Sequence, residues 1–285
     1  MFRLVNVDGR AALDHQGAWF DLARLSGDPE LADPRTAVAR HAELHALADR
    51  CATGDPDGSI DDVELGPPVP DPRQVFAIGL NYGGHADESG LPRPSSPMVF
   101  TKFTSCLAGP TADLPLSGPA VDWEVELVAV VGRTARHVTV DDAWSAVAGL
   151  TLGQDVSDRI VQFTDEPAQF SLGKSFPGYG PVGPALVSLD AFADPDDVGL
   201  WCEVDGDRVQ DGRSSDLIFS VPALVAHLSS ICTLLPGDLI FTGTPSGVGV
   251  ASGRFLAPGQ LLRSGAEVIG ELANRCTGGD GPDSP

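Results

Sequence analysis

One apolar segment, residues 121–132, constrains the fold more than any other part of the chain. Its sequence, VDWEVELVAVVG, predicts a long buried β-strand. Successive side chains of a strand point to opposite faces, so Glu124 and Glu126 point the same way. Val128 and Val130 continue that face, which becomes apolar beyond the carboxylates. Two like charges in such a place are unfavourable unless they reach solvent, one is protonated, or a cation binds between them.

A divalent cation is the simplest of these remedies, because hard cations such as Mg²⁺ and Ca²⁺ prefer oxygen ligands. A third carboxylate normally helps to hold such an ion. Asp155 ends the next predicted strand, GLTLGQDV (149–156), and is the candidate for that role. The alternative is an edge strand whose carboxylate-bearing face is solvated, and periodicity alone leaves both interpretations open.

Glycine and proline are frequent elsewhere, with 33 and 24 copies in 285 residues. These counts favour many short strands and turns over long helices. Helical spacing is clearest at 220–232 and is also present at 36–50. A polar, proline-rich stretch at 53–72 is the best boundary candidate, and we place the boundary near residue 68.

This boundary defines three parts of the chain. They are a small N-terminal domain (1–68), a catalytic domain (69–276) and a tail (277–285) that we expect to be disordered.

The charge balance excludes some partners. Eighteen basic residues stand against 40 acidic ones, a formal net charge of -22. Nucleic acids and anionic membranes both bind through basic surfaces, so we expect neither as a partner. A small anionic substrate stays compatible if a metal ion or placed Arg and Lys side chains offset the repulsion. Five cysteines without CxxC spacing, and no apolar leader or 18-residue apolar run, lead us to expect a cytoplasmic protein.

Lysine is rare in this chain: 16 of the 18 basic residues are Arg, and the two lysines are Lys102 and Lys174. A GC-rich coding bias explains the scarcity without any function. A lysine that remains under such a bias can also mark a position that needs a compact charge with an adjustable pKa, which Arg cannot supply. The composition leaves both explanations open.

His85 and Glu88 lie three residues apart, just after a predicted strand at 74–79. In a helical turn the two side chains share a face, where the carboxylate can orient the imidazole and raise its basicity. Such a pair can act as a general base toward a water molecule. The segment GYGPVG (178–183) formally matches a dinucleotide-binding pattern, but its proline and the strand that follows it argue against that function.

Seven segments, in this order, resemble the fumarylacetoacetate hydrolase (FAH) family, in its branch of acylpyruvate hydrolases and 2-hydroxyhepta-2,4-diene-1,7-dioate isomerases. No single segment is decisive, whereas the ordered set is highly specific, and it covers roughly residues 70–276. The segments are GLNYGGHADE (79–88), PMVFTKFTSCLAGP (97–110), DWEVELVAVVG (122–132), GLTLGQDVSDR (149–159), SLGKSFPGYGPVGP (171–184), SSDLIFSVPALVAHLSSICTLLPGDLIFTGTPSGVG (214–249) and GELANRC (270–276).

The resemblance implies a mixed, β-rich α+β fold. Its catalytic part is a distorted β-roll or barrel of the FAH C-terminal type, here preceded by a small N-terminal α+β domain, and the protein is implied to be a homodimer. The resemblance also implies Mg²⁺ or Mn²⁺ held by Glu124, Glu126 and Asp155, with Ca²⁺ as a further occupant in crystals.

The resemblance assigns roles to other residues as well. In smaller members of the family a His and a Glu after the NY motif activate water, and they match His85 and Glu88. Lys174, in the GKSF motif, is the third implied catalytic residue. The implied substrate-binding residues are Arg159, Lys102, Tyr82, Gln162 and Thr244. Gln154 stands where the family commonly has Asn, and Pro177-Gly178 and Gln260 also depart from its pattern, so the substrate pocket is expected to be atypical.

The implied function is a metal-dependent hydrolase acting on C–C bonds in ketonic substances, of the kind that serves aromatic catabolism. Its substrate class is an acylpyruvate-type 2,4-dioxo acid. The ion chelates the carboxylate and carbonyl oxygens, His85 with Glu88 delivers water, and the metal and Lys174 stabilise the pyruvate enolate that is left. Alternatives with the same residues are an oxaloacetate-type decarboxylase and an isomerase or hydratase of unsaturated 2-oxo acids. A non-catalytic protein that binds anionic metabolites is a further alternative.

Overall fold

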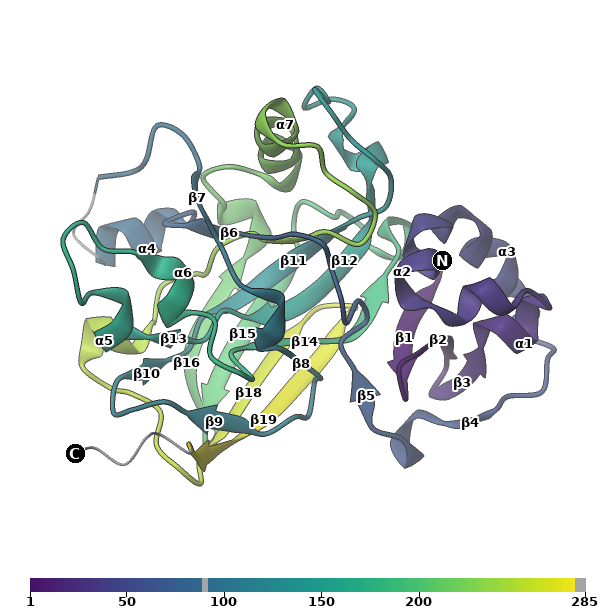
Figure 1. Ribbon diagram of the computed structural model, residues 1–285, viewed down its shortest axis with the longest axis horizontal. Coiled ribbons are helices and arrows are strands. Elements are labelled where there is room, and N and C mark those ends of the chain that lie inside the picture. Colours follow the sequence, from purple (N-terminus) through teal and green to yellow (C-terminus); the bar gives the residue numbers. More distant parts are fainter. Residues whose placement is uncertain (89–91, 280–285) are drawn as a thin grey trace.

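Most strands of the protein belong to one large mixed sheet (Figure 1). A computed structural model describes residues 1–88 and 92–279, without the side chains of residues 85–87. In order across the sheet the strands are β4 (Gly58–Ser59), β3 (Ala18–Asp21), β2 (Arg10–His15), β1 (Arg3–Val7), β14 (Gly180–Val187), β12 (Val147–Gln154), β11 (Val125–Val131), β17 (Leu239–Phe241), β6 (Val75–Gly79) and β7 (Met98–Thr101). Two short strands lie off this path: β5 (Leu65–Gly66) pairs with β1, and β8 (Leu107–Ala108) pairs with β14.

A second, five-stranded sheet packs against the large one. Leu200 and Leu272 of this sheet belong to the same buried cluster as Val125 and Leu127 of β11. The predicted strand-rich α+β fold is confirmed, and neither sheet closes into a barrel within the described residues. The second sheet has the order β16 (Asp207–Arg213), β15 (Gly199–Val204), β18 (Leu261–Ala266), β19 (Gly270–Gly278), β9 (Leu114–Leu116), and a separate pair consists of β10 (Val121–Asp122) and β13 (Ser157–Asp158).

β11 is a central strand and not an edge. It pairs antiparallel with β12 on one side and with β17 on the other, and all of its residues are buried. Val125 and Leu127 face the core between the two sheets. Val128 and Val130 face a second core that also contains Phe241. The predicted alternation is therefore confirmed, and the alternative of a solvated edge strand is wrong.

The helices are short, and the two longest, α3 (His41–Cys51) and α7 (Val221–Ile231), have 11 residues each. They fall on the two predicted helical segments, although the first segment is divided at Arg40, whose backbone is not helical. No helix of the described residues is long and apolar enough to cross a membrane. The remaining α-helices are α1 (Leu22–Ser26), α2 (Pro34–Ala39), α4 (Gly83–Glu88), α5 (Arg159–Gln162), α6 (Phe170–Gly173) and α8 (Gly249–Ser252).

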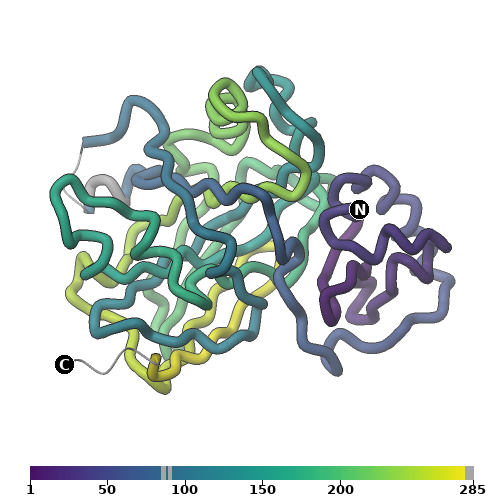
Figure 2. The backbone as a smooth tube through the Cα atoms, viewed as in Figure 1, coloured from purple at the N-terminus to yellow at the C-terminus, as the bar shows by residue number. Residues whose placement is uncertain are grey.

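The N-terminal segment forms one flank of the molecule (Figure 2). β1 pairs antiparallel with β14, with Leu4 opposite Leu186, so the large sheet continues from this segment into the rest of the chain. Leu44 of α3 shares a core with Leu4 and with Val128 of β11. A domain boundary near residue 68 stays a prediction, but hydrogen bonds and packing cross it.

The C-terminal segment is partly a strand. β19 extends to Gly278, and Thr277 lies opposite Pro115 of β9, so two residues of the predicted tail belong to the second sheet. Residues 280–285, the rest of the predicted disordered tail after Gly279, lie outside the described part.

Replacement of Leu4 tests the connection between β1 and the large sheet. Leu4 is fully buried, and we expect Leu4→Ala to lower the free energy of unfolding of the whole chain by about 2–5 kcal/mol, through lost burial and the cavity left behind. Urea unfolding followed by tryptophan fluorescence and circular dichroism measures this change. Val140→Ala, at a half-exposed position, is the control. A separate transition of the N-terminal segment, with the rest unchanged, would contradict the continuity of the core.

Candidate active site

Three carboxylates meet where β11 begins and β12 ends. Glu124 directly precedes β11, Glu126 lies within it, and Asp155 directly follows β12. The antiparallel register sets Val125 opposite Gln154, which brings the start of one strand beside the end of the other. One oxygen from each carboxylate lies within 4.8 Å of the others, and all three residues are buried.

The donor set fits a divalent cation. Mg²⁺ and Ca²⁺ bind oxygens at about 2.0–2.6 Å, so one ion can reach three oxygens at these separations. Glu126 accepts a hydrogen bond from the Gly243 N–H (2.7 Å). Burial, followed by the charges of Asp155 and Glu124, raises the pKa of Glu126 well above its ordinary value. A bound cation would remove this penalty, because it offsets both the burial and the repulsion.

Both lysines of the chain lie in this cluster. Lys174 Nζ donates hydrogen bonds to Glu124 Oε2 (2.7 Å) and to Asp155 Oδ2 (2.6 Å). Burial by itself lowers the pKa of Lys174, but the charges of Asp155 and Glu124 outweigh it and hold the pKa above the ordinary value. Lys174 is therefore positively charged between two of the predicted metal ligands.

Lys102 contacts the cluster through Asp155 and Lys174. Its Nζ is 2.8 Å from Asp155 Oδ1 and donates a hydrogen bond to the backbone oxygen of Lys174. The contact with Asp155 Oδ1 lacks hydrogen-bond alignment, and that oxygen is buried without a hydrogen bond from any described residue. Asp155 Oδ1 thus keeps acceptor capacity that a metal ion can use. The convergence of two rare lysines on one carboxylate favours the functional explanation of their retention.

Arg159, at the start of α5, is the third buried cation. Its Nε donates to Asp122 Oδ2 (2.8 Å), its Nη2 to Glu124 Oε1 (2.7 Å) and its Nη1 to Gln162 Oε1 (2.8 Å). Burial opposes the charge, but Glu124 and Asp122 keep the pKa of Arg159 above its ordinary value. The guanidinium is thereby fixed beside the predicted metal ligands.

Asp122 is a member of the site that sequence reasoning missed. It is fully buried, and besides Arg159 it accepts hydrogen bonds from the N–H groups of Gly249 (2.7 Å) and Val250 (2.9 Å). It therefore links Arg159 to the start of α8. A signal was present, since Asp122 stands two residues before Glu124 and so continues the alternation of carboxylates.

The cluster as a whole carries unequal charge. If every group is ionised, four carboxylates face three cations and one negative charge remains uncompensated. A proton or a further cation can balance it. The carboxylates are Asp122, Glu124, Glu126 and Asp155, and the cations are Lys102, Arg159 and Lys174.

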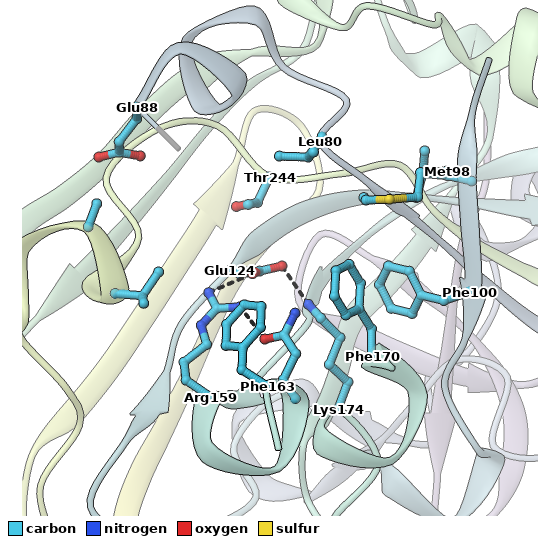
Figure 3. A pocket seen from close by; sticks show the side chains of 15 residues that line it. Leu80, Glu88, Met98, Phe100, Glu124, Arg159, Phe163, Phe170, Lys174 and Thr244 are labelled. Atoms are coloured by element: carbon cyan, nitrogen blue, oxygen red, sulfur yellow. Dashed lines mark hydrogen bonds and ion pairs between the residues drawn. The ribbon is translucent and has the colours of Figure 1, made fainter. Parts of the chain in front are cut away.

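The charged cluster opens on a cavity of about 370 Å³ (Figure 3). Glu124, Arg159 and Lys174 line it, and hydrogen bonds link the carboxylate of Glu124 to the two cations. Gln162 and Thr244, both predicted to bind substrate, also line the cavity. The structure thus gathers one charged wall from the segments around β11, α5 and α6.

Other predicted residues lie further from this wall. Glu88, at the end of α4, lines the cavity and accepts a hydrogen bond from the Gly247 N–H (3.1 Å). Figure 3 shows Glu88 well apart from Lys174. The side chain of His85 lies outside the described part of the structure, so the pairing of His85 with Glu88 stays a prediction. Tyr82 does not line this cavity; it is buried and lines a different one.

An apolar wall was also missed from the sequence. Met98 and Phe100 of β7, Phe163 after α5 and Phe170 of α6 line the cavity. These residues come from three separate elements, and nothing in their local sequence marks them as neighbours.

Comparisons with known proteins point to one family. Residues 74–277 match the family described as fumarylacetoacetate (FAA) hydrolase C-terminal. The human protein named oxaloacetate tautomerase FAHD2A, mitochondrial, is 42% identical over 207 residues, which are 72% of this chain and 65% of that protein.

Two solved structures extend the likeness to nearly the whole chain. A Mycobacterium smegmatis protein with the provisional name HpcE has a TM-score of 0.91 at 44% identity, over 98% of this chain and 100% of that one. Maleylpyruvate hydrolase from Sphingobium sp. SYK-6, in complex with manganese (II) ion and pyruvate, has a TM-score of 0.82 at 27% identity, over 98% of this chain and 100% of that one.

Glu126→Gln tests the burial of excess negative charge in the metal-free protein. A carboxyl with a raised folded-state pKa takes up a proton on folding, so its contribution to stability falls as pH rises above the ordinary value of 4.5. Since glutamine does not titrate, we expect the variant to gain stability relative to the original chain, by up to about 1.4 kcal/mol per pH unit until the raised pKa is passed. Urea unfolding in EDTA at pH 5 and pH 8 measures this difference.

Added metal should reverse this order of stability, so that the original chain becomes more stable than the Glu126→Gln variant. At an ion concentration 100 times its Kd the original chain should gain about 2.7 kcal/mol, whereas the variant should gain much less. The control is Glu43→Gln, an exposed carboxyl whose pKa Arg40 lowers and which should show no stabilisation with rising pH. A Glu126→Gln protein that is less stable than the original chain at pH 8 in EDTA would contradict the argument.

Proposed function

The chain belongs to the fumarylacetoacetate hydrolase family, and from this premise we propose that it is a divalent-metal-dependent enzyme that hydrolyses the C3–C4 bond of an acylpyruvate-type 2,4-dioxo acid. One observation carries the proposal. Three buried carboxylates converge on one point, and one of them, Glu124, forms with the buried cations Arg159 and Lys174 a wall of a cavity large enough for a small acid.

Glu124, Glu126 and Asp155 would hold the ion. When bound, a divalent ion supplies a positive charge to which the carboxylate and carbonyl oxygens of a 2-oxo acid can bind. The manganese in the maleylpyruvate hydrolase structure supports Mn²⁺ or Mg²⁺ as the occupant. Arg159 and Lys174 face the same cavity, where they can bind the substrate carboxylate and stabilise the negative charge of an enolate.

Hydrolysis needs a water molecule and a base. We assign the base to His85, oriented by Glu88 of the same helix, α4. His85 takes a proton from the water, and the water oxygen adds to the C4 carbonyl carbon. The C3–C4 bond then breaks, and its electron pair passes to C3 and the C2 carbonyl as pyruvate enolate. The acyl group leaves as a carboxylate, and a proton added to C3 gives pyruvate.

A second candidate is the tautomerisation of an oxaloacetate-type acid. The human relative at 42% identity bears that activity in its name. Keto–enol exchange moves a proton at C3 and needs no attacking water. The charged Lys174 beside Glu124 can donate the proton in such a step or stabilise the negative charge of the enolate. Decarboxylation of an oxaloacetate-type acid, and isomerisation or hydration of an unsaturated 2-oxo acid, would use the same enolate.

Product analysis with and without metal distinguishes these reactions. With acetylpyruvate and Mg²⁺ or Mn²⁺ we expect equal amounts of pyruvate and acetate, and none in EDTA. His85→Ala should lower kcat by about 10²–10⁴-fold, the usual contribution of a general base. His227→Ala, in α7 and away from the cavity, is the matched control.

Other outcomes would contradict parts of the proposal. Conversion of oxaloacetate with acetylpyruvate left intact would favour the tautomerase or decarboxylase. Full hydrolytic activity of His85→Ala would remove His85 from the water step. Metal-dependent binding of 2-oxo acids without conversion of any would favour the metabolite-binding alternative.

A further inference from the structure

The cavity has two chemically different walls (Figure 3). The charged wall of Glu124, Arg159 and Lys174 suits the carboxylate and carbonyl oxygens of a 2-oxo acid. The adjoining wall carries the side chains of Phe100 and Phe170 and further apolar residues. Lys174 Nζ lies 5.1 Å from the centroid of the Phe100 ring, so the two walls adjoin directly. A substrate bound by its acid end therefore extends its other end along aromatic surface.

The aromatic wall is a packed structure. The Phe170 ring lies edge-to-face on Phe100 (5.6 Å between centroids, 80° between planes) and on Phe163 (6.2 Å, 78°). Gly79 borders Met98 so closely that a Cβ at this position would come within 2.4 Å of the Met98 methyl group. Edge-to-face contacts hold aromatic rings in place, so this wall offers a preformed apolar surface.

The described part of the wall supplies no cation for a second substrate carboxylate. Among the described residues the cations that line the cavity are Arg159 and Lys174, and the proposed function assigns both to the acid end of the substrate. The other ionisable lining residues of the described part, Glu88 and Glu124, are carboxylic acids and offer no cation to a distal carboxylate. A carboxylate placed against Phe100 and Phe170 would lose hydration without a partner, which is strongly unfavourable.

On the basis of the proposed function, we infer that the substrate is a 2-oxo acid whose distal arm is uncharged and apolar, either an alkyl or an aromatic acyl group. Two relatives are named for dicarboxylic substrates, oxaloacetate and maleylpyruvate. The substrate of this chain would differ from those in its distal end, which would carry no carboxylate. The cavity volume, about 370 Å³, falls in the range of pockets that hold drug-sized ligands. Pyruvate alone, with six heavy atoms, leaves most of the aromatic wall uncovered.

A series of 2,4-dioxo acids tests the inference by turnover. We expect kcat/KM to rise about fourfold for each methylene added to the acyl arm until the cavity is filled. The benzoyl member should be a better substrate than acetylpyruvate. An acid of equal length that ends in a second carboxylate should be at least about tenfold worse than its apolar counterpart. A kcat/KM that does not change along the series, or that is higher for the dicarboxylic acid, would overturn the inference.

Variants locate the preference on the aromatic wall. Phe170→Ala should lower kcat/KM for the benzoyl substrate by about tenfold or more, and should lower it less for acetylpyruvate, whose short arm covers less of the wall. Phe163 is half-exposed, so Phe163→Arg should fold and should shift the preference toward the dicarboxylic acid. Phe103→Ala, an exposed phenylalanine that does not line the cavity, is the matched control. An unchanged preference in Phe163→Arg would contradict the assignment.

Binding separates a failure of this inference from a failure of the proposed function. With Mn²⁺ present, 2-oxohexanoate and 2-oxohexanedioate have equal carbon chains and differ in the distal carboxylate. Isothermal titration calorimetry should give at least about tenfold tighter binding of the monocarboxylate. If no dioxo acid is hydrolysed but this preference holds, the hydrolase proposal fails and the apolar-arm inference stands. Equal or tighter binding of the dicarboxylate would overturn the inference whatever the turnover.

Discussion

The repulsion among buried carboxylates is the constraint on which the site depends. Glu124, Glu126 and Asp155 converge where water cannot screen them, and a carboxylate in that position must be protonated or matched by a cation. The side chains of the protein offset this negative charge only in part. Lys174 and Lys102, for example, form ion pairs with Asp155. On the proposed function, a metal ion would offset the remaining imbalance, which otherwise lowers the stability of the metal-free state. Function and instability thus share one origin, as is common where charges are buried for chemistry.

The sheet supplies what this arrangement needs. β11 is hydrogen-bonded on both sides, so the positions of Glu124 and Glu126 are fixed by a backbone that cannot move independently. The antiparallel pairing with β12 determines that Asp155 arrives at the same place. Flexible loops would hold the three oxygens less tightly. The cations come from shorter elements around this rigid centre, where Arg159 begins α5 and Lys174 directly follows α6.

Local sequence predicted the part of the site that a single strand determines. Alternation in 121–132 placed Glu124 and Glu126 on one face, and the next strand end gave Asp155. Resemblance added Arg159 and Lys174, which the structure brings to the same cluster.

The rest depends on contacts that no local pattern reports. Asp122 acquires its role only because Arg159 folds back onto it, and Phe100, Phe163 and Phe170 meet only through the packing of β7, α5 and α6.

The continuous sheet has a consequence for how the chain can be divided. The family match begins at residue 74, but β14 takes one of its three strand partners, β1, from residues 3 and 4. A chain cut at the family boundary would leave the unpaired backbone of Leu186 and Val187 as an apolar sheet edge, which invites strand addition from another copy and aggregation.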